Sequence, residues 1–256
     1  MHAISALDAA LLAGAGLAAG FVNTAAGAGS LLTLRALMLT GLPADFANGT
    51  NRVPVLAQSL VAAHGFSKHV PLQRQELLRA AGPSCAGALF GSLAATVTPE
   101  RVMRFLLIGV LLGVAFLGLW TARRGKKKVE DPAERLVLTP GSTFWLFLSG
   151  LYGGFLQAGV GLILLFALGS VAKLNLVRAN ALKVGTVAIF SVVTAVVFIA
   201  RGQVAWPHAG AMSLGAMLGA ALGVRYAVKY AAQLQVFVVV VDVVACIALV
   251  WKEIAG

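Results

Sequence analysis

The chain contains 256 residues, of which 59% are hydrophobic and only 11% are charged. A soluble domain has about 25% charged residues, and a disordered chain has low hydrophobicity, so both classes are excluded. The net charge of +11 comes from basic residues in short loops between apolar runs. A nucleic-acid-binding protein instead has a clustered basic face. We therefore expect a polytopic membrane protein that binds no nucleic acid.

Ten apolar runs succeed one another, close to the limit for 256 residues at about 20 residues per crossing. A basic stretch, RRGKKKVEDPAER (123–135), separates the first five from the last five. We predict an all-α protein with an N-terminal membrane repeat (1–122), a cytoplasmic basic linker (123–140) and a C-terminal membrane repeat (141–256). The runs cover residues 6–25, 29–42, 46–65, 77–98, 102–121, 142–157, 160–171, 178–200, 206–226 and 232–251.

The two halves share a repeat offset of 132 residues. Asn48 matches Asn180 and Ser59 matches Ser191 at this offset. If successive helices cross the membrane in alternating directions, most Lys and Arg residues lie on one side, in the linker and in the loops on the same side as the linker. The positive-inside rule makes that side cytoplasmic. Both termini are then outside, and the halves are inverted repeats of about five helical segments each, an architecture of secondary transporters. We predict a multi-pass protein of the inner (cytoplasmic) membrane.

Each half opens with two runs that we expect to be short and separated by a glycine break. The first break contains Gly27 and Gly29, and the second contains Gly159 and Gly161. A helix of about 13 residues rises about 20 Å, less than the bilayer core, so we expect discontinuous or re-entrant helices. Paired breaks of this kind point to the binding site of a transporter. Other glycines are expected to pack helices together: Gly14, Gly16, Gly87, Gly91, Gly219 and Gly223.

Polar and cationic side chains near the breaks favour an anionic ligand. A helix start presents unpaired N–H groups and the positive end of its dipole. The third run of each half adds a cation, Arg52 or Lys183, and ionisable groups within spans are functional candidates. The alternative is that each cation extends to the nearby interface. The predicted anion site comprises Asn23, Thr24, Gly27, Gly29, Ser30, Asn48, Asn51, Arg52, Gln157, Gly159, Gly161, Asn180 and Lys183.

The sequence contains no catalytic or metal-binding signature. A nucleophile elbow, a P-loop, an HExxH pattern and a dinucleotide-binding pattern are all missing. Cys85 and Cys246 have no CxxC neighbour. We expect no enzyme activity, no cofactor and no metal. Arg35 lies in mid-run and is expected to pair with Asp45 or Asp242.

Several segments resemble one known family. The segments GFVNTAAGAGSLLTLRALMLTGLPADFANGTNR (20–52), GLYGGFLQAGVG (150–161) and VRANALKVG (177–185) are similar to the TauE/SafE family of sulfite exporters, also called toluene-sulfonate uptake permeases. The resemblance covers nearly the whole chain and implies a bacterial-type inner-membrane transporter of sulfite, sulfonates or related anions. Arg35 and Ala167 stand where the family pattern has prolines.

These observations lead to one functional prediction with two alternatives. We expect a secondary transporter that moves a small anion by alternating access, with sulfite, a sulfonate, another organosulfur anion or a carboxylate as its substrate. Its partners are the lipid bilayer and that anion, and a homodimer is left open. The alternatives are an anion channel and a non-transporting membrane scaffold or assembly protein.

Overall fold

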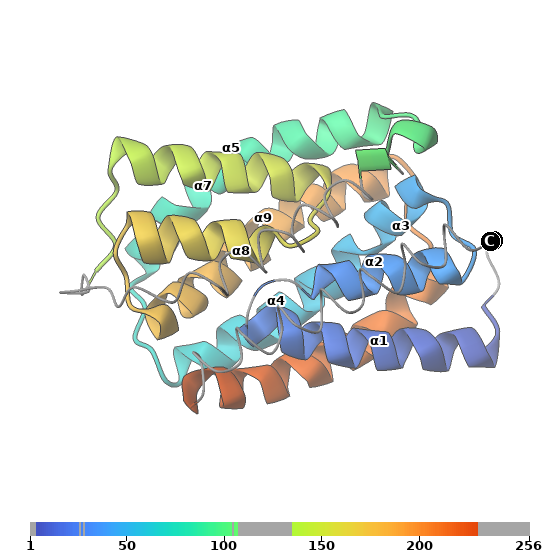
Figure 1. Cartoon of the computed structure of the whole chain (residues 1–256), viewed down its shortest axis with the longest axis horizontal. Helices are drawn as coiled ribbons and strands as arrows, with labels where there is room; N and C mark the ends of the chain where they lie inside the picture. The colour runs from blue at the N-terminus through green and yellow to red at the C-terminus, as the bar shows by residue number, and fades with distance from the viewer. Residues whose placement is uncertain (1–3, 26, 28, 104, 107–134, 230–256) are drawn as a thin grey trace.

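The structure is a computed structural model that describes residues 4–25, 27, 29–103, 105–106 and 135–229. The described residues form helices joined by short connections and contain no β-strand (Figure 1). Four helices are long and apolar enough to cross a membrane: α1, α5, α9 and the helix Trp206–Lys229. The labelled elements are α1 (Ala6–Ala25), α2 (Ser30–Leu39), α3 (Ala44–Thr50), α4 (Arg52–Ser67), α5 (Arg74–Val97), α7 (Pro140–Phe155), α8 (Val160–Leu165), the π-helix η1 (Phe166–Val171) and α9 (Leu176–Ala200).

The predicted runs and the observed helices agree closely, with corrections at the first break and in the run 46–65. α1 has 20 residues and is long enough to span by itself, so the prediction that both opening runs are short is wrong for α1. Its partner α2 has 10 residues and rises only about 15 Å. Residue 104 and residues 107–121 of the run 102–121, the whole run 232–251, most of the linker and Asp242 lie outside the described residues.

A proline divides the helix that was expected over residues 46–65. α3 ends at Thr50 and α4 begins at Arg52. Pro54 has no N–H to donate to the carbonyl of Thr50, and its ring crowds that carbonyl, which interrupts the helix there. The corresponding helix of the second half, α9, contains no proline and continues without interruption for 25 residues.

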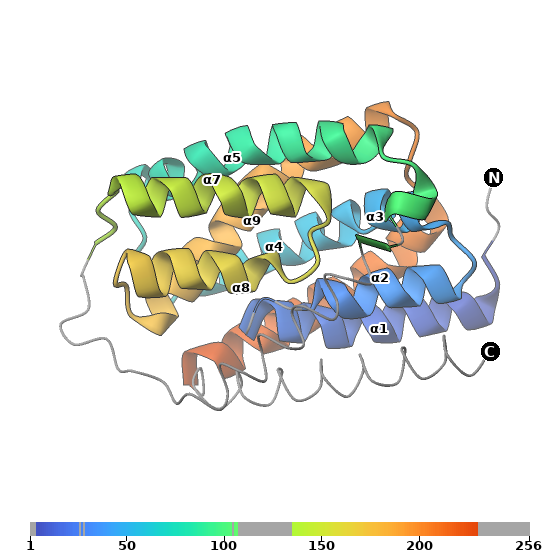
Figure 2. The same cartoon turned by 45° about the horizontal axis from the view of Figure 1, so that its top comes forward.

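The helices that carry the two breaks lie on opposite sides of the bundle. Figures 1 and 2 show α5 beside α7 along one side and α1 beside the helix Trp206–Lys229 along the other, with α4 and α9 between them. Both outer pairs come together at glycines, where an added Cβ would collide with the neighbouring backbone. Among the described residues, nothing lies within 4 Å of a Cβ added at Gly14, so they do not support the packing prediction there. The prediction is correct for the other five: Gly16, Gly87, Gly91, Gly219 and Gly223.

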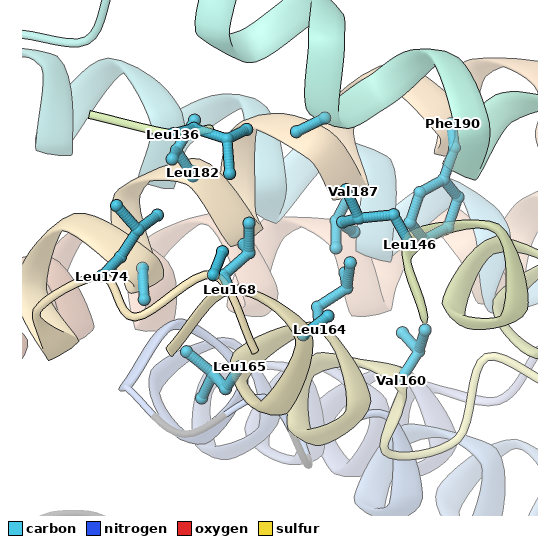
Figure 3. Close-up of a cluster of buried hydrophobic side chains, with 14 of the residues drawn as sticks. Leu136, Leu146, Val160, Leu164, Leu165, Leu168, Leu174, Leu182, Val187 and Phe190 are labelled. Carbon is cyan, nitrogen blue, oxygen red and sulfur yellow. The ribbon is translucent and has the colours of Figure 1, made fainter. Parts of the chain in front are cut away.

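The largest buried cluster holds the second break in place. Val160 and Leu164 of α8 point toward Leu146 of α7 and toward Val187 and Phe190 of α9 (Figure 3). Phe190 and Leu164 are both completely buried. Close van der Waals packing of these side chains holds α8 against α9.

Candidate functional site

The two glycine breaks cross each other inside the protein. Gly27 has a φ of 87°, which favours glycine. A Cβ added to Gly27 would lie 2.5 Å from the carbonyl carbon of Gly161, and a Cβ on Gly161 would likewise collide with the Gly27 backbone. Gly159 also has a positive φ, of 71°. The close approach of the two backbones therefore depends on glycine in both halves.

Arg52 is completely buried beside the second break. Its Nη1 donates to the carbonyl oxygen of Gly153 and, at 2.6 Å, to Oε1 of Gln157. Its Nη2 donates to Oδ1 of Asn48 at 2.9 Å and to the carbonyl oxygen of Phe155 at 3.1 Å. The guanidinium carbon also lies 4.7 Å from the ring centre of Phe198, a cation–π distance. Arg52 thus binds the carbonyl end of α7.

Lys183 is 2% exposed and lies beside the first break, one residue before the position that matches Arg52 at the offset of 132. Its Nζ donates to the carbonyl oxygens of Asn23 at 3.0 Å and Thr24 at 3.2 Å. It also donates to Oδ1 of Asn180 at 2.8 Å. These three acceptors use all three N–H bonds of an ammonium group. Lys183 thus binds the carbonyl end of α1.

Each cation is accompanied by an asparagine that contacts the last residue of the same helix. Asn48 donates to the carbonyl oxygen of Phe155 at 2.8 Å, and Asn180 donates to that of Ala25 at 3.4 Å. The last carbonyls of a helix lack partners and carry the negative end of its dipole, so a cation and an amide stabilise them. In both cases the capping residues belong to the other half of the chain.

The positive charges of Arg52 and Lys183 are compensated by dipoles. Among the residues that the structure describes, their partners are carbonyl and amide oxygens, and no carboxylate contacts either cation. Glu76, a buried carboxylate, instead binds Arg178 at 2.7 Å and accepts from the backbone N–H of Leu136 at 2.9 Å. Within the described residues, each of the two buried cations is therefore balanced by oxygen dipoles alone.

A small pocket opens on the Lys183 side of the crossing. Among the predicted residues, Asn23, Thr24, Gly161 and Lys183 line it, and they come from α1, α8 and α9. Helix α4 completes it with residues that the sequence analysis did not select. The full lining is Asn23, Thr24, Gln58, Ser59, Ala62, Val160, Gly161, Lys183, Val184 and Val187.

The remaining predicted site residues lie around the crossing without lining this pocket. Asn48, Arg52 and Gln157 form the cluster at the end of α7, and Asn180 supports Lys183. Gly27, Gly29 and Gly159 shape the breaks. The Oγ of Ser30 and both polar atoms of the Asn51 amide are buried without a hydrogen-bond partner. Anion binding by these residues stays a prediction.

Sequence reasoning missed two features. Gln58 lies seven residues after Asn51 and three after Val55, so the helical spacing of the polar face contained the signal for it. The pairing of Glu76 with Arg178 joins residues 102 positions apart, and no local pattern indicates it.

Gln157 adopts a φ of 60°, which is uncommon for a residue other than glycine.

Comparison with known proteins identifies the family. The family model for the sulfite exporter TauE/SafE matches residues 12–249, most of the chain. The chain belongs to the TauE/SafE family. It is therefore a member of a membrane transporter family with several apolar helices, as expected of a multi-pass membrane protein. The family assignment agrees with the prediction of a transporter rather than an enzyme.

Curated relatives extend this result. The chain is 30% identical over 209 residues to a Sinorhizobium protein named "Probable membrane transporter protein ORF9", covering 78% of this chain and 76% of the relative. It is 26% identical to a "Probable membrane transporter protein" of Haemophilus influenzae, covering 82% and 81%. It is 29% identical to the Escherichia coli K12 "Probable membrane transporter protein YfcA", covering 78% and 73%. No solved structure gives a significant match.

Proposed function

We propose that this TauE/SafE family member is a secondary transporter that carries a small anion through the pocket beside Lys183. The observation that carries the proposal is a pocket at the crossing of two helix breaks, lined by a cation that is 2% exposed. Irregular backbone inside a membrane is tolerated where it is buried in protein or lines a cavity. Discontinuous helices near the midplane bind substrates in many secondary transporters.

The chemistry of the lining supports an anion as the substrate. Lys183 supplies a positive charge, while Asn23, Thr24 and Ser59 supply side chains that hydrogen-bond to oxygens. The pocket has a volume of about 10 Å³ in this structure, room for one water, so it has to widen to admit a substrate. The anions that need the least widening are compact ones: sulfite, a short sulfonate, another small organosulfur anion or a short carboxylate. The family description, which names a sulfite exporter, supports the same class.

We further infer that the two halves, residues 1–122 and 141–256, are inverted repeats joined by a cytoplasmic linker at 123–140. The reciprocal capping supports this arrangement, because Arg52 caps α7 while Lys183 caps α1. The basic linker and loops support an inner-membrane protein with both termini outside. Alternating access then requires the halves to rock about the crossing of Gly27 and Gly161.

Counterflow in proteoliposomes tests the proposed function. Vesicles containing purified protein are loaded with unlabelled sulfite, ethanesulfonate, acetate or phosphate, and uptake of the labelled anion is followed. We expect saturable, anion-selective counterflow that Lys183→Gln abolishes and that the exposed-site control Lys68→Gln retains. Size-exclusion chromatography in detergent establishes that each variant is folded.

The other outcomes discriminate among the alternatives. Flux that does not saturate and shows no counterflow would identify an anion channel. A folded protein that moves none of these anions would contradict the transporter proposal and favour a scaffold. Full counterflow in folded Lys183→Gln would contradict the assignment of the pocket.

A further inference from the structure

A second recess lies at the end of the bundle where the chain enters α7, and in Figure 2 the start of α5 lies at the same end. Its volume is about 300 Å³, and it shares no lining residue with the pocket beside Lys183. A water needs about 10–15 Å³ by the same measure, so a phosphate-sized ion enters this recess without any widening. The lining consists of Pro71, Leu72, Gln73, Arg135 and Arg178.

Both charged residues of this lining are arginines with N–H groups to spare. The Nη2 of Arg178 donates to Oε2 of Glu76 at 2.7 Å. Its Nη1 has no partner among the described residues and, unlike the buried Nε, is accessible. Arg135 is exposed and makes no hydrogen bond or ion pair with the part of the chain that the structure describes. Each guanidinium can therefore donate to a ligand in the recess.

Glu76 positions Arg178 without lining the recess. Its side chain is nearly buried and also accepts from the backbone N–H groups of Gln73 at 3.2 Å and Leu136 at 2.9 Å. Its carboxylate balances one of the two arginines, which leaves a net charge of +1. The helices α5 and α9 both begin here, so the positive ends of two long helix dipoles add to that charge.

We propose that this recess is a binding site for a phosphate-type oxyanion, with Arg178 and Arg135 as its ligands. A guanidinium group presents parallel N–H bonds that match two oxygens of such an ion. Two sources offer this chemistry: a free oxyanion, and the phosphate of an anionic phospholipid at the membrane surface. The site is separate from the transport pocket, and the inference holds whether or not the pocket beside Lys183 carries an anion.

Two binding measurements on the full chain distinguish the sources. In the first, protein purified in an uncharged detergent is titrated with inorganic phosphate by isothermal titration calorimetry. In the second, the same protein is titrated with phosphatidylglycerol in mixed micelles, with phosphatidylcholine as the uncharged reference, and bound lipid is measured by native mass spectrometry. We expect saturable binding of at least one anionic probe.

Three substitutions locate the binding. Arg135→Gln should weaken binding of that probe by about tenfold, the size of one hydrogen bond between charged groups. Arg178→Lys should weaken it similarly, because an ammonium group keeps the charge beside Glu76 but loses the planar fork. Arg74→Gln is the matched control, since Arg74 is an exposed cation next to Gln73 that does not line the recess. It should bind the probe as the wild type does.

Each outcome decides the inference. Phosphate binding that Arg135→Gln weakens identifies a site for a free oxyanion, and phosphatidylglycerol binding alone, weakened in the same way, identifies a lipid headgroup site. Binding of neither probe by folded wild-type protein overturns the proposal. Equal affinities of Arg135→Gln and Arg74→Gln also overturn it, because the anion then binds elsewhere. If Arg178→Lys does not fold, the comparison of these two variants decides.

Discussion

In each of the two regions around the crossed breaks, a cation and an asparagine cap the end of a helix. The regions differ in what occupies the space beside the cation. On the Arg52 side, the side chain of Gln157 bridges Arg52 at 2.6 Å and Ser191 at 3.3 Å, and Phe198 covers the guanidinium. On the Lys183 side, Gln58 and Ser59 border a pocket. The same capping arrangement is thus filled by side chains in one half and borders a small pocket in the other.

This difference shows that similar elements with similar capping can take different roles. Arg52 makes four hydrogen bonds that fix the end of α7, and Pro54 divides α3 from α4 next to it. Lys183 makes three hydrogen bonds from the uninterrupted helix α9. We therefore assign a mainly structural role to the Arg52 side and substrate contact to the Lys183 side.

The largest effect is expected at the crossing that both regions share. Gly27→Ala should prevent accumulation of folded protein, because its Cβ would collide with Gly161. Gly41→Ala is the matched control, since Gly41 has a φ of 85° but nothing within 4 Å of an added Cβ. Gly41→Ala should cost only the strain of a left-handed residue, about 1–2 kcal/mol. Fluorescence-detected size exclusion measures both, and equal losses would contradict the close crossing.

The second-largest effect, a loss of stability, is expected when the guanidinium group of Arg52 is removed. Arg52→Met leaves the oxygens of Gly153, Phe155 and Gln157 without this donor, at about 1–3 kcal/mol for each oxygen that stays unsatisfied. We expect a much lower thermal unfolding temperature in detergent than for the exposed-site control Arg201→Met. An unfolding temperature of Arg52→Met equal to that of the control would contradict the structural role of Arg52.

Lys183→Arg separates the two roles. The longer guanidinium keeps the charge that caps α1 but occupies part of the pocket, so the unfolding temperature should stay near that of the wild type. Counterflow should fall by about tenfold or more, equivalent to about 1.4 kcal/mol. The reciprocal variant Arg52→Lys should lose mainly stability, because an ammonium group cannot reproduce the planar fork. The same loss of stability in both variants would show that the two sides are equivalent.

The smallest effect is expected at Asn48 and Asn180, the two asparagines that contact the helix ends. Asn48 reaches its helix end at 2.8 Å and Asn180 reaches its own at 3.4 Å. Asn48→Ala should therefore lower the free energy of unfolding by about 1 kcal/mol more than Asn180→Ala does. Chemical denaturation of the two variants in detergent gives the difference. A larger loss of unfolding free energy for Asn180→Ala would instead assign the structural role to the Lys183 side.

Much of the fold follows from local sequence patterns. The apolar runs predicted α1, α5, α9 and the helix Trp206–Lys229, because the length of each run reflects the thickness of a bilayer. The breaks followed from the glycines, and the contact of Arg52 with Asn48 is a four-residue helical spacing.

The partners of the site residues did not follow from the sequence. Arg52 binds carbonyls about 100 positions away along the chain, and backbone oxygens carry no residue-specific signal. The interruption of the helix near Pro54, in contrast, is predictable from the sequence, because a proline has no N–H to donate to the carbonyl four residues earlier. The position of Gln58 in a pocket lining, where the second half has the buried Phe190, became evident only when the pocket was located on one side of the crossing.

Ligand protection at Ser59 and Ser191 tests the central claim most directly. In a background with Cys85 and Cys246 changed to serine, Ser59→Cys and Ser191→Cys place one thiol at each of two matching positions. Labelling by N-ethylmaleimide is then measured with and without the anion that shows counterflow. The account predicts that the anion slows labelling of Ser59→Cys and that Ser191→Cys, which is completely buried, is labelled in neither condition. Equal protection at both positions, or protection at Ser191→Cys alone, would contradict it.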